Sequence, residues 1–305
     1  MLVGAWIQHL SAGLTASLGA LVFLYLPETS LLARLRSLCV SCVVMLVSYG
    51  IGMLSASETL LQFIGLAVAT TMTTQYCRVF TLGGPPGSLF FVIAASIGAA
   101  GHASLMEWLP KMTLVAAGCL WGLVVALCYS LLVRTKATSR SSNSLVSAFR
   151  KNYKETIFIG FVVGISLVIA QTLQMDNLYW VPISCLAVIQ GGSLREVWRK
   201  QLHRMIGTSL GLFLVSFIFR FPLVSDFQIA FWIVLLTFLI ELTVARHYAT
   251  AVMFITPMTV LLADASNASQ TSLSTLAQAR LLDTAIGCFL GLCGGFYLHA
   301  NRRES

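Results

Sequence analysis

Two stretches far apart in the chain, RLLDTAIGCFLG at residues 280–291 and KMTLVAAGCLWG at residues 111–122, share one pattern. Each begins with a cation, and each then has an alanine, a glycine, a cysteine and a second glycine at the same positions. Each stretch also opens an apolar run, and a charged side chain is costly where such a run enters a bilayer. The pattern therefore poses two questions: whether the chain spans a membrane, and whether it contains a repeat.

The composition of the chain indicates a membrane protein. Of its 305 residues, 57% are hydrophobic and only 10% are charged, whereas a soluble domain has about 25% charged residues. Apolar runs recur along the chain, most of them close to the roughly 20 residues that a spanning helix needs. We therefore expect an all-α polytopic protein with about eleven transmembrane helices in a lipid bilayer. The runs are approximately 9–27, 36–53, 58–75, 85–102, 112–133, 156–173, 179–191, 205–221, 226–243, 247–263 and 280–299.

The positions of the cations predict the topology. If every run crosses, the connecting segments alternate between two sides, and 16 of the 19 lysines and arginines fall on one side. The positive-inside rule makes that side cytoplasmic, which places the N-terminus outside and the C-terminus inside the inner (plasma) membrane. The net charge of +8 is then a consequence of topology, so nucleic-acid binding is not expected. The shortest run, 179–191, contains Pro182, and the charge count favours its crossing.

The second question is answered by an internal repeat. The two opening stretches are 169 residues apart, RSLCVSCVVMLVSY (36–49) matches RMIGTSLGLFLVSF (204–217) at 168, and Tyr76 matches Tyr248 at 172. Similar offsets in the same order indicate duplication. Equivalent runs are six crossings apart, so the repeats are parallel. We expect a first repeat of five helices at 1–134, without a partner for 156–173, a basic cytoplasmic linker at 135–155, and a second repeat of six at 156–305.

Four motifs of the second half follow one another in a recognisable order. They are YWVPISCLAVIQGG (179–192), RMIGTSLG (204–211), RHYATAVMFITP (246–257) and RLLDTAIG (280–287). In that order they resemble the fusaric acid resistance, or aromatic acid exporter, family of membrane proteins. The resemblance implies a secondary transporter that exports aromatic or other organic acids, driven by the proton gradient. It also implies kinship with plant organic-anion channels, in which cations line one pore.

Several residues are candidates for binding the organic anion. Arg280 and Lys111 are equivalent in the repeat and lie on the external side, where two cations facing each other would attract a carboxylate; each could instead anchor a helix end. Arg204 begins the run equivalent to that of Arg36, and the two could form an inner cation pair. The resemblance adds three aromatic candidates, which are Tyr179, Trp180 and Tyr248.

Two acidic residues are candidates for proton coupling. Asp283 lies one helical turn after Arg280 and has Leu114 as its repeat equivalent. A carboxylate inside a membrane is a functional candidate, although Asp283 could also form a simple ion pair with Arg280. Glu241 lies near the cytoplasmic end of its run, where it could accept a proton or pair with Arg246 or His247.

Three pairs of glycines have the G-x-x-x-G spacing that lets helices pack closely. They are Gly118 and Gly122, Gly207 and Gly211, and Gly287 and Gly291. Breaks at Pro257 and at Pro85-Pro86 fall at corresponding places in the two halves, as in the discontinuous helices of transporters. The eight cysteines are scattered among apolar residues, which indicates neither a metal site nor a disulfide framework. No cofactor is expected.

The sequence leaves three functions open. The first is proton-coupled export of organic anions, and the second is a passive anion channel lined by Lys111, Arg280, Arg36 and Arg204. The third is a membrane subunit or scaffold that does not transport and assists an envelope partner protein. A homo-oligomer is equally compatible with the sequence. An enzyme is not expected, because no zinc motif, serine–lysine pair or paired acids in one helix are visible.

Overall fold

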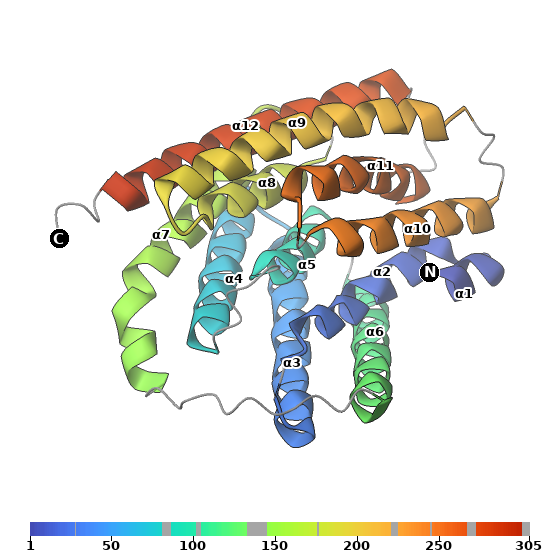
Figure 1. The fold of residues 1–305 in the computed structure, drawn as a ribbon, viewed down its shortest axis with the longest axis horizontal. Helices are drawn as coiled ribbons and strands as arrows, with labels where there is room; N and C mark the ends of the chain where they lie inside the picture. The colour runs from blue at the N-terminus through green and yellow to red at the C-terminus, as the bar shows by residue number, and fades with distance from the viewer. Residues whose placement is uncertain are drawn as a thin grey trace. The chain divides into compact units, whose positions relative to one another are not determined.

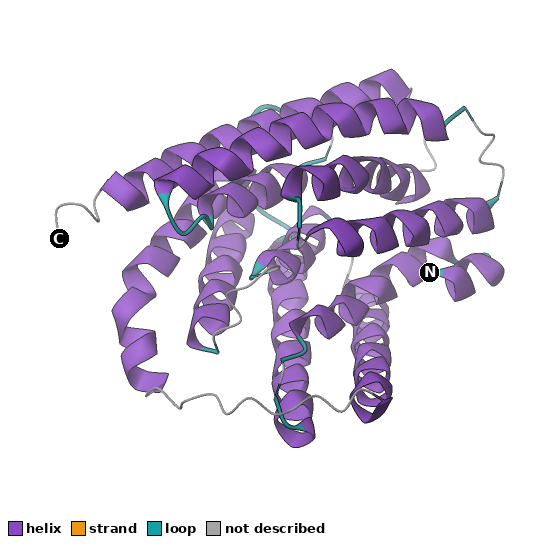
Figure 2. Ribbon diagram, viewed as in Figure 1, coloured by secondary structure: helices purple, strands orange, loops and turns teal. Residues whose placement is uncertain are grey.

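The computed structural model describes residues 1–27, 29–80, 87–101, 105–132, 145–175, 177–220, 225–244, 246–266 and 273–300. Throughout these ranges the regular structure is helical, without strands (Figures 1 and 2). The helices are α1 (Leu2–Trp6), α2 (Leu10–Ala20), the 3-10 helix η1 (Leu21–Tyr25), α3 (Leu31–Ser55), α4 (Thr59–Val79), α5 (Leu89–Ala100), α6 (Leu105–Leu132), α7 (Leu145–Thr172), α8 (Trp180–Ile189), α9 (Leu194–Ile218), α10 (Asp226–Val244), α11 (Tyr248–Ser266) and α12 (Leu273–Ala300).

The helices confirm the predicted all-α class. Each of the eleven apolar runs coincides with one helix, or with α2 and η1 together, and α1 is an additional short helix. Among the helices of the described residues, six are long and apolar enough to cross a membrane: α3, α6, α7, α9, α10 and α12. Helix α8 has ten residues, about 15 Å of helix against a hydrocarbon core of about 30 Å. The count of eleven crossings therefore stays a prediction.

The chain forms two compact units. One comprises Thr15–Gly164, and the other comprises Met1–Leu14 together with Ile165–Ser305. Helix α7 contains the boundary between them and begins at Leu145, so the second part of the predicted linker 135–155 is helical. The first part of that linker, like Pro85-Pro86, lies outside the described residues.

Several helix pairs that correspond in the repeat are in contact in both units. In the unit of Thr15–Gly164, α3 packs against α5 and α6, α4 packs against α5, and η1 packs against α6. In the other unit, α9 packs against α11 and α12, α10 packs against α11, and α8 packs against α12. Figure 1 shows α9 and α12 side by side along their length. This correspondence supports the duplication inferred from the sequence.

The repeated glycines lie where these helices approach one another closely. A Cβ on Gly118 would collide with the carbonyl oxygen of Ala16 on α2. A Cβ on Gly287 would lie 2.5 Å from the carbonyl oxygen of Val181 on α8, and one on Gly291 would lie 2.6 Å from that of Cys185. Because only hydrogen fits at these contacts, the G-x-x-x-G pairs let backbones meet as they do in membrane helix pairs.

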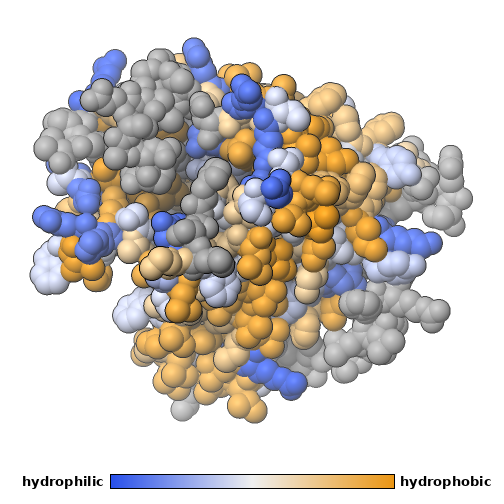
Figure 3. Space-filling model, turned by 180° about the vertical axis from the view of Figure 1, so that it is seen from behind, coloured by the Kyte–Doolittle hydropathy of each residue, from blue (hydrophilic) through white to orange (hydrophobic). Residues whose placement is uncertain are grey.

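Large apolar side chains cover much of the surface. Figure 3 shows broad hydrophobic areas with few hydrophilic residues between them. Exposed examples include Trp121 on α6, Phe213 on α9 and Phe238 on α10. Patches of this extent are unfavourable in water and are expected for helices that face lipid, so the surface agrees with a multi-pass membrane protein.

Candidate functional site: a buried cationic cluster

The start of α9 determines where Arg204 lies. The sequence analysis placed Arg204 at the beginning of its helix, and this was wrong: α9 begins at Leu194. Ser193 caps it, because its Oγ accepts a hydrogen bond from the amide of Glu196, whose carboxylate in turn accepts one from the amide of Gly192. The sequence has the capping-box signature S-x-x-E, although the Glu196 carboxylate binds the amide of Gly192, one residue before the capping Ser193. Arg204 is therefore well inside α9 and only 4% exposed.

Two polar side chains hold the Arg204 guanidinium. Its Nη2 donates to Ser184 Oγ on α8 at 3.0 Å, and its Nη1 donates to the hydroxyl of Tyr248, the first residue of α11, at 3.1 Å. The close approach of α9 to α11 at Gly207, whose Cβ would lie 2.5 Å from the carbonyl oxygen of Ala249, makes the contact with Tyr248 possible. Gly211 meets α11 in the same way at Thr256.

Arg280 lies against an aromatic ring. Its helix, α12, begins at Leu273, so Arg280 is not at the helix entrance as expected but two turns inside, where it is 4% exposed. The guanidinium carbon is 3.8 Å from the centroid of the Trp180 ring on α8, a cation–π contact that is stronger when desolvated. The Nε and Nη1 atoms of Arg280 are buried and have no hydrogen-bond partner. This guanidinium therefore keeps donors for a further group.

Asp283 brings an opposite charge to the same place. It lies one turn after Arg280 on α12 and is 0% exposed. Arg280 is close enough to Asp283 for attraction and to Arg204 for repulsion. Tyr179, whose ring centroid is 5.1 Å from that of Trp180, lies within range of Arg280 and Asp283. Six sequence candidates from four segments thus meet in one cluster, which we call the arginine cluster: Arg204, Arg280, Asp283, Tyr179, Trp180 and Tyr248.

Two other candidates from the sequence, Glu241 and Lys111, are not among the six residues of this cluster. Glu241 is exposed on α10, and no ion pair joins it to Arg246 or His247, all three being described. Lys111, on α6, forms an ion pair with Glu107 at 2.9 Å and keeps 36% of its side chain exposed. Lys111 belongs to the other compact unit, and its pairing with Arg280 stays a prediction. The predicted inner pair has one exposed member, Arg36, and one buried member, Arg204.

Ser184, which accepts a hydrogen bond from Arg204, was not predicted from the sequence. The sequence signal that could have found it is a hydroxyl residue within the apolar stretch YWVPISCLAVIQGG, because a buried hydroxyl requires a hydrogen-bond partner. All ten residues of α8, Ser184 included, are buried. Arg34 was also missed as a buried residue: it is 4% exposed on α3, and its Nη1 donates to Ser130 Oγ at 3.4 Å.

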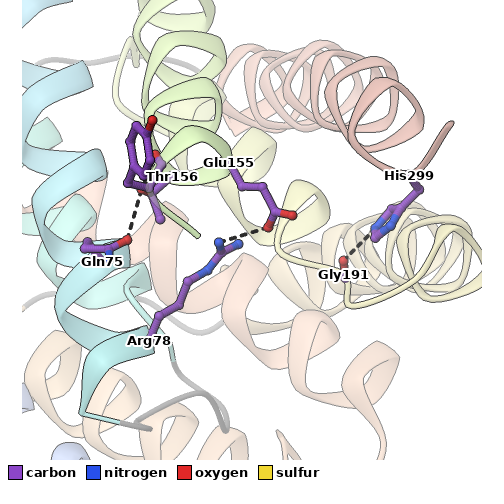
Figure 4. Close-up of polar contacts among 7 residues, drawn as sticks. Gln75, Arg78, Glu155, Thr156, Gly191 and His299 are labelled. Atoms are coloured by element: carbon purple, nitrogen blue, oxygen red, sulfur yellow. Dashed lines mark hydrogen bonds and ion pairs between the residues drawn. The ribbon is translucent and has the colours of Figure 1, made fainter. Parts of the chain in front are cut away.

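Other polar contacts join helices and loops within each unit (Figure 4). In the unit of Thr15–Gly164, Arg78 on α4 pairs with Glu155 on α7 at 3.0 Å, and Thr156 donates to Gln75 at 3.1 Å. In the other unit, His299 on α12 lies 3.0 Å from the carbonyl oxygen of Gly191, just after α8. These contacts are structural links and hold no unpaired buried cation.

The arginine cluster is suited to binding an anion. Within the described ranges no three His, Cys, Asp or Glu side chains gather in a metal-binding group, and the described cysteines are free thiols. The cluster has two buried cations, one buried acid and an aromatic pair, which are the groups that recognise a carboxylate attached to a ring. The fold and the cluster together define a multi-pass α-helical membrane protein with a buried cationic site in its second half.

Comparisons with known proteins agree with this class. Residues 163–294, which contain the whole arginine cluster, match the family described as fusaric acid resistance protein-like. The chain is also 30% identical over 139 residues to the uncharacterized membrane protein YvaC of Bacillus subtilis (strain 168). That match covers 46% of this chain and 22% of the relative. No solved structure matches the chain. The predicted resemblance to the fusaric acid resistance family is therefore confirmed for the second half.

Proposed function

We propose that this protein is an inner-membrane transporter that exports organic, in particular aromatic, carboxylate anions, and that the arginine cluster binds them. The observation that carries the proposal is Arg280, which is 4% exposed and has two buried nitrogen atoms without a hydrogen-bond partner. Buried N–H groups of a charged side chain that lack acceptors are costly, and charged residues within membrane helices mark substrate pathways. A bound carboxylate would relieve this cost.

The second arginine and the aromatic pair extend this interpretation. Arg204 already has Ser184 and Tyr248 as acceptors, so its position is fixed while its charge still attracts an anion. Trp180 covers one face of the Arg280 guanidinium, which leaves the edge of that group for the carboxylate. Tyr179 lies beside Trp180, where an aromatic substrate ring would find an apolar partner.

Asp283 is the proposed proton-coupling residue. It is fully buried beside Arg280, so gain or loss of its proton changes the charge that the anion meets. In the proposed orientation the N-terminus is outside and the C-terminus is cytoplasmic. Glu241, which is exposed on α10, is a weaker candidate because it lies apart from the cluster.

Efflux from proteoliposomes tests the proposal. Proteoliposomes that contain the purified full chain and are loaded with radiolabelled 4-hydroxybenzoate should release it faster than protein-free liposomes with the same load. Arg280→Gln and Arg204→Gln should each reduce this rate at least tenfold, because one buried charge interaction is worth more than about 1.4 kcal/mol. Arg34→Gln is the matched control, since Arg34 is equally buried in the other unit, and its rate should be that of the wild type.

The outcomes separate the three functions. If the wild-type chain releases no organic anion, transport is rejected and a non-transporting subunit is favoured. If both arginine variants keep the wild-type rate, the arginine cluster is not the site. With Asp283→Asn, a coupled transporter should lose uphill export under an imposed proton gradient and keep downhill flux. A wild-type chain that shows only downhill flux would instead be a passive anion channel.

A further inference from the structure

The arginine cluster has an odd number of charges. Among the described side chains of its unit, the charged groups that are buried are Arg204, Arg280 and Asp283. Helix α8 has no charged residue, and the other charged residues of α9 lie in its first two turns, where they are exposed or half-buried. Two positive charges and one negative charge therefore leave the cluster one positive charge in excess.

We infer that Asp283 determines the charge of the anion: the site accepts an anion with one negative charge and rejects a similar anion with two. This inference rests on the proposed function, because it assumes that Arg204 and Arg280 bind the anion. A monocarboxylate neutralises the excess charge of the cluster. A dicarboxylate would leave one negative charge uncompensated in a buried site, which is the costly situation. Asp283 is thus a specificity-determining residue.

The repeat supports a special role for Asp283. Its equivalent in the other unit is Leu114, and the equivalent of Arg280 is Lys111, which has its own acidic partner in Glu107. Close packing of α12 on α8 does not require an acid either, because the equivalent contact of α6 with α2 forms at Gly118 without one. Asp283 is therefore an addition to the shared scaffold, placed beside Arg280.

Two probes of nearly the same shape and different charge test the inference. Terephthalate has two carboxylates, and 4-carbamoylbenzoate has an amide in place of one of them. Isothermal titration of the full chain in detergent should show that the wild type binds 4-carbamoylbenzoate at least tenfold more tightly than terephthalate. In Asp283→Asn the excess becomes two positive charges, so the preference should reverse by a similar factor. Asp283→Glu keeps the charge and should keep the wild-type preference.

Each result decides the matter. Equal affinity of the wild type for both probes, or tighter binding of terephthalate, would overturn the inference even if Asp283→Asn does not fold. An unchanged preference in a folded Asp283→Asn would do the same. These failures differ from failure of the proposed function, in which the wild type binds neither probe or Arg280→Gln binds both as tightly as the wild type does.

Discussion

The two halves of the chain use equivalent positions differently. In the second half Arg204 and Arg280 are each 4% exposed and Asp283 is 0% exposed. Their equivalents in the first half are Arg36, which is exposed, Lys111, which is ion-paired at the surface, and half-buried Leu114. The first half instead fills its core with aromatic contacts: Tyr25 stacks on Phe91 at 4.4 Å between ring centroids.

This difference separates scaffold from site. Both halves share equivalent helix contacts and close approaches at equivalent glycines, so these contacts do not require the three buried charges of the arginine cluster. Buried charges reduce stability unless they are compensated, and retention of three of them in one half indicates a function there. Four predictions test the separation, in order of decreasing effect.

Alanine substitution of equivalent glycines should lower the stability equally in both halves. Gly287→Ala and Gly118→Ala each place a methyl group against a backbone carbonyl of the neighbouring helix. Each should therefore lower the free energy of unfolding by about 3 kcal/mol, seen as a lower midpoint of thermal denaturation in detergent. Gly50→Ala is the control, since its Cβ would meet only the Met112 side chain at 3.7 Å. A large loss at Gly287 with none at Gly118 would contradict a shared scaffold.

Loss of the hydroxyl from two equivalent tyrosines should lower the stability unequally. Tyr248 accepts a hydrogen bond from charged Arg204, whereas the Tyr76 hydroxyl pairs with Ser41 Oγ at 2.9 Å. Because bonds to charged groups are stronger, Tyr248→Phe should cost about 2 kcal/mol and Tyr76→Phe about 1 kcal/mol. The same denaturation experiment measures both. Tyr248→Phe should also weaken binding of 4-carbamoylbenzoate, while Tyr76→Phe should leave binding unchanged; equal effects on binding would remove Tyr248 from the site.

The ring over Arg280 should have a smaller effect. Trp180→Phe keeps an aromatic face but weakens the cation–π contact, so we expect a loss of about 1 kcal/mol in stability. Trp121→Phe is the matched control, because Trp121 is 66% exposed on α6. Thermal denaturation of both variants checks this prediction, and equal midpoints would show that the contact at Trp180 contributes nothing.

The smallest effect is expected at a half-buried ion pair of the first half. Arg78 and Glu155 are 3.0 Å apart with 29% and 25% of their side chains exposed. Such pairs contribute about 0.5 kcal/mol. A double-mutant cycle of Arg78→Gln and Glu155→Gln should give a coupling energy of this size that decreases in high salt. A coupling above about 2 kcal/mol would mean that the first half also depends on a charged contact.

The sequence predicted the helices better than the site. Apolar runs mark helices in a membrane protein because the bilayer requires both length and low charge, and all eleven runs are helical. The first residues of the helices were predicted less well, because an apolar run stops at the nearest charged residues, whereas the helix itself continues through them. The S-x-x-E signal at Ser193 gives the start of α9, and reading it would have placed Arg204 inside the helix.

The sequence alone determined the helical class, the repeat and its glycine contacts, because hydrophobicity and spacing are local properties of the chain. It also identified each charged residue of the arginine cluster. Only the tertiary structure decided that Arg204, 76 residues before Arg280, lies beside it, that Ser184 and Trp180 hold the pair, and that Glu241 is exposed on α10. The reason is that charge interactions depend on distance and burial, and these are set by helix packing, which joins residues far apart in the chain.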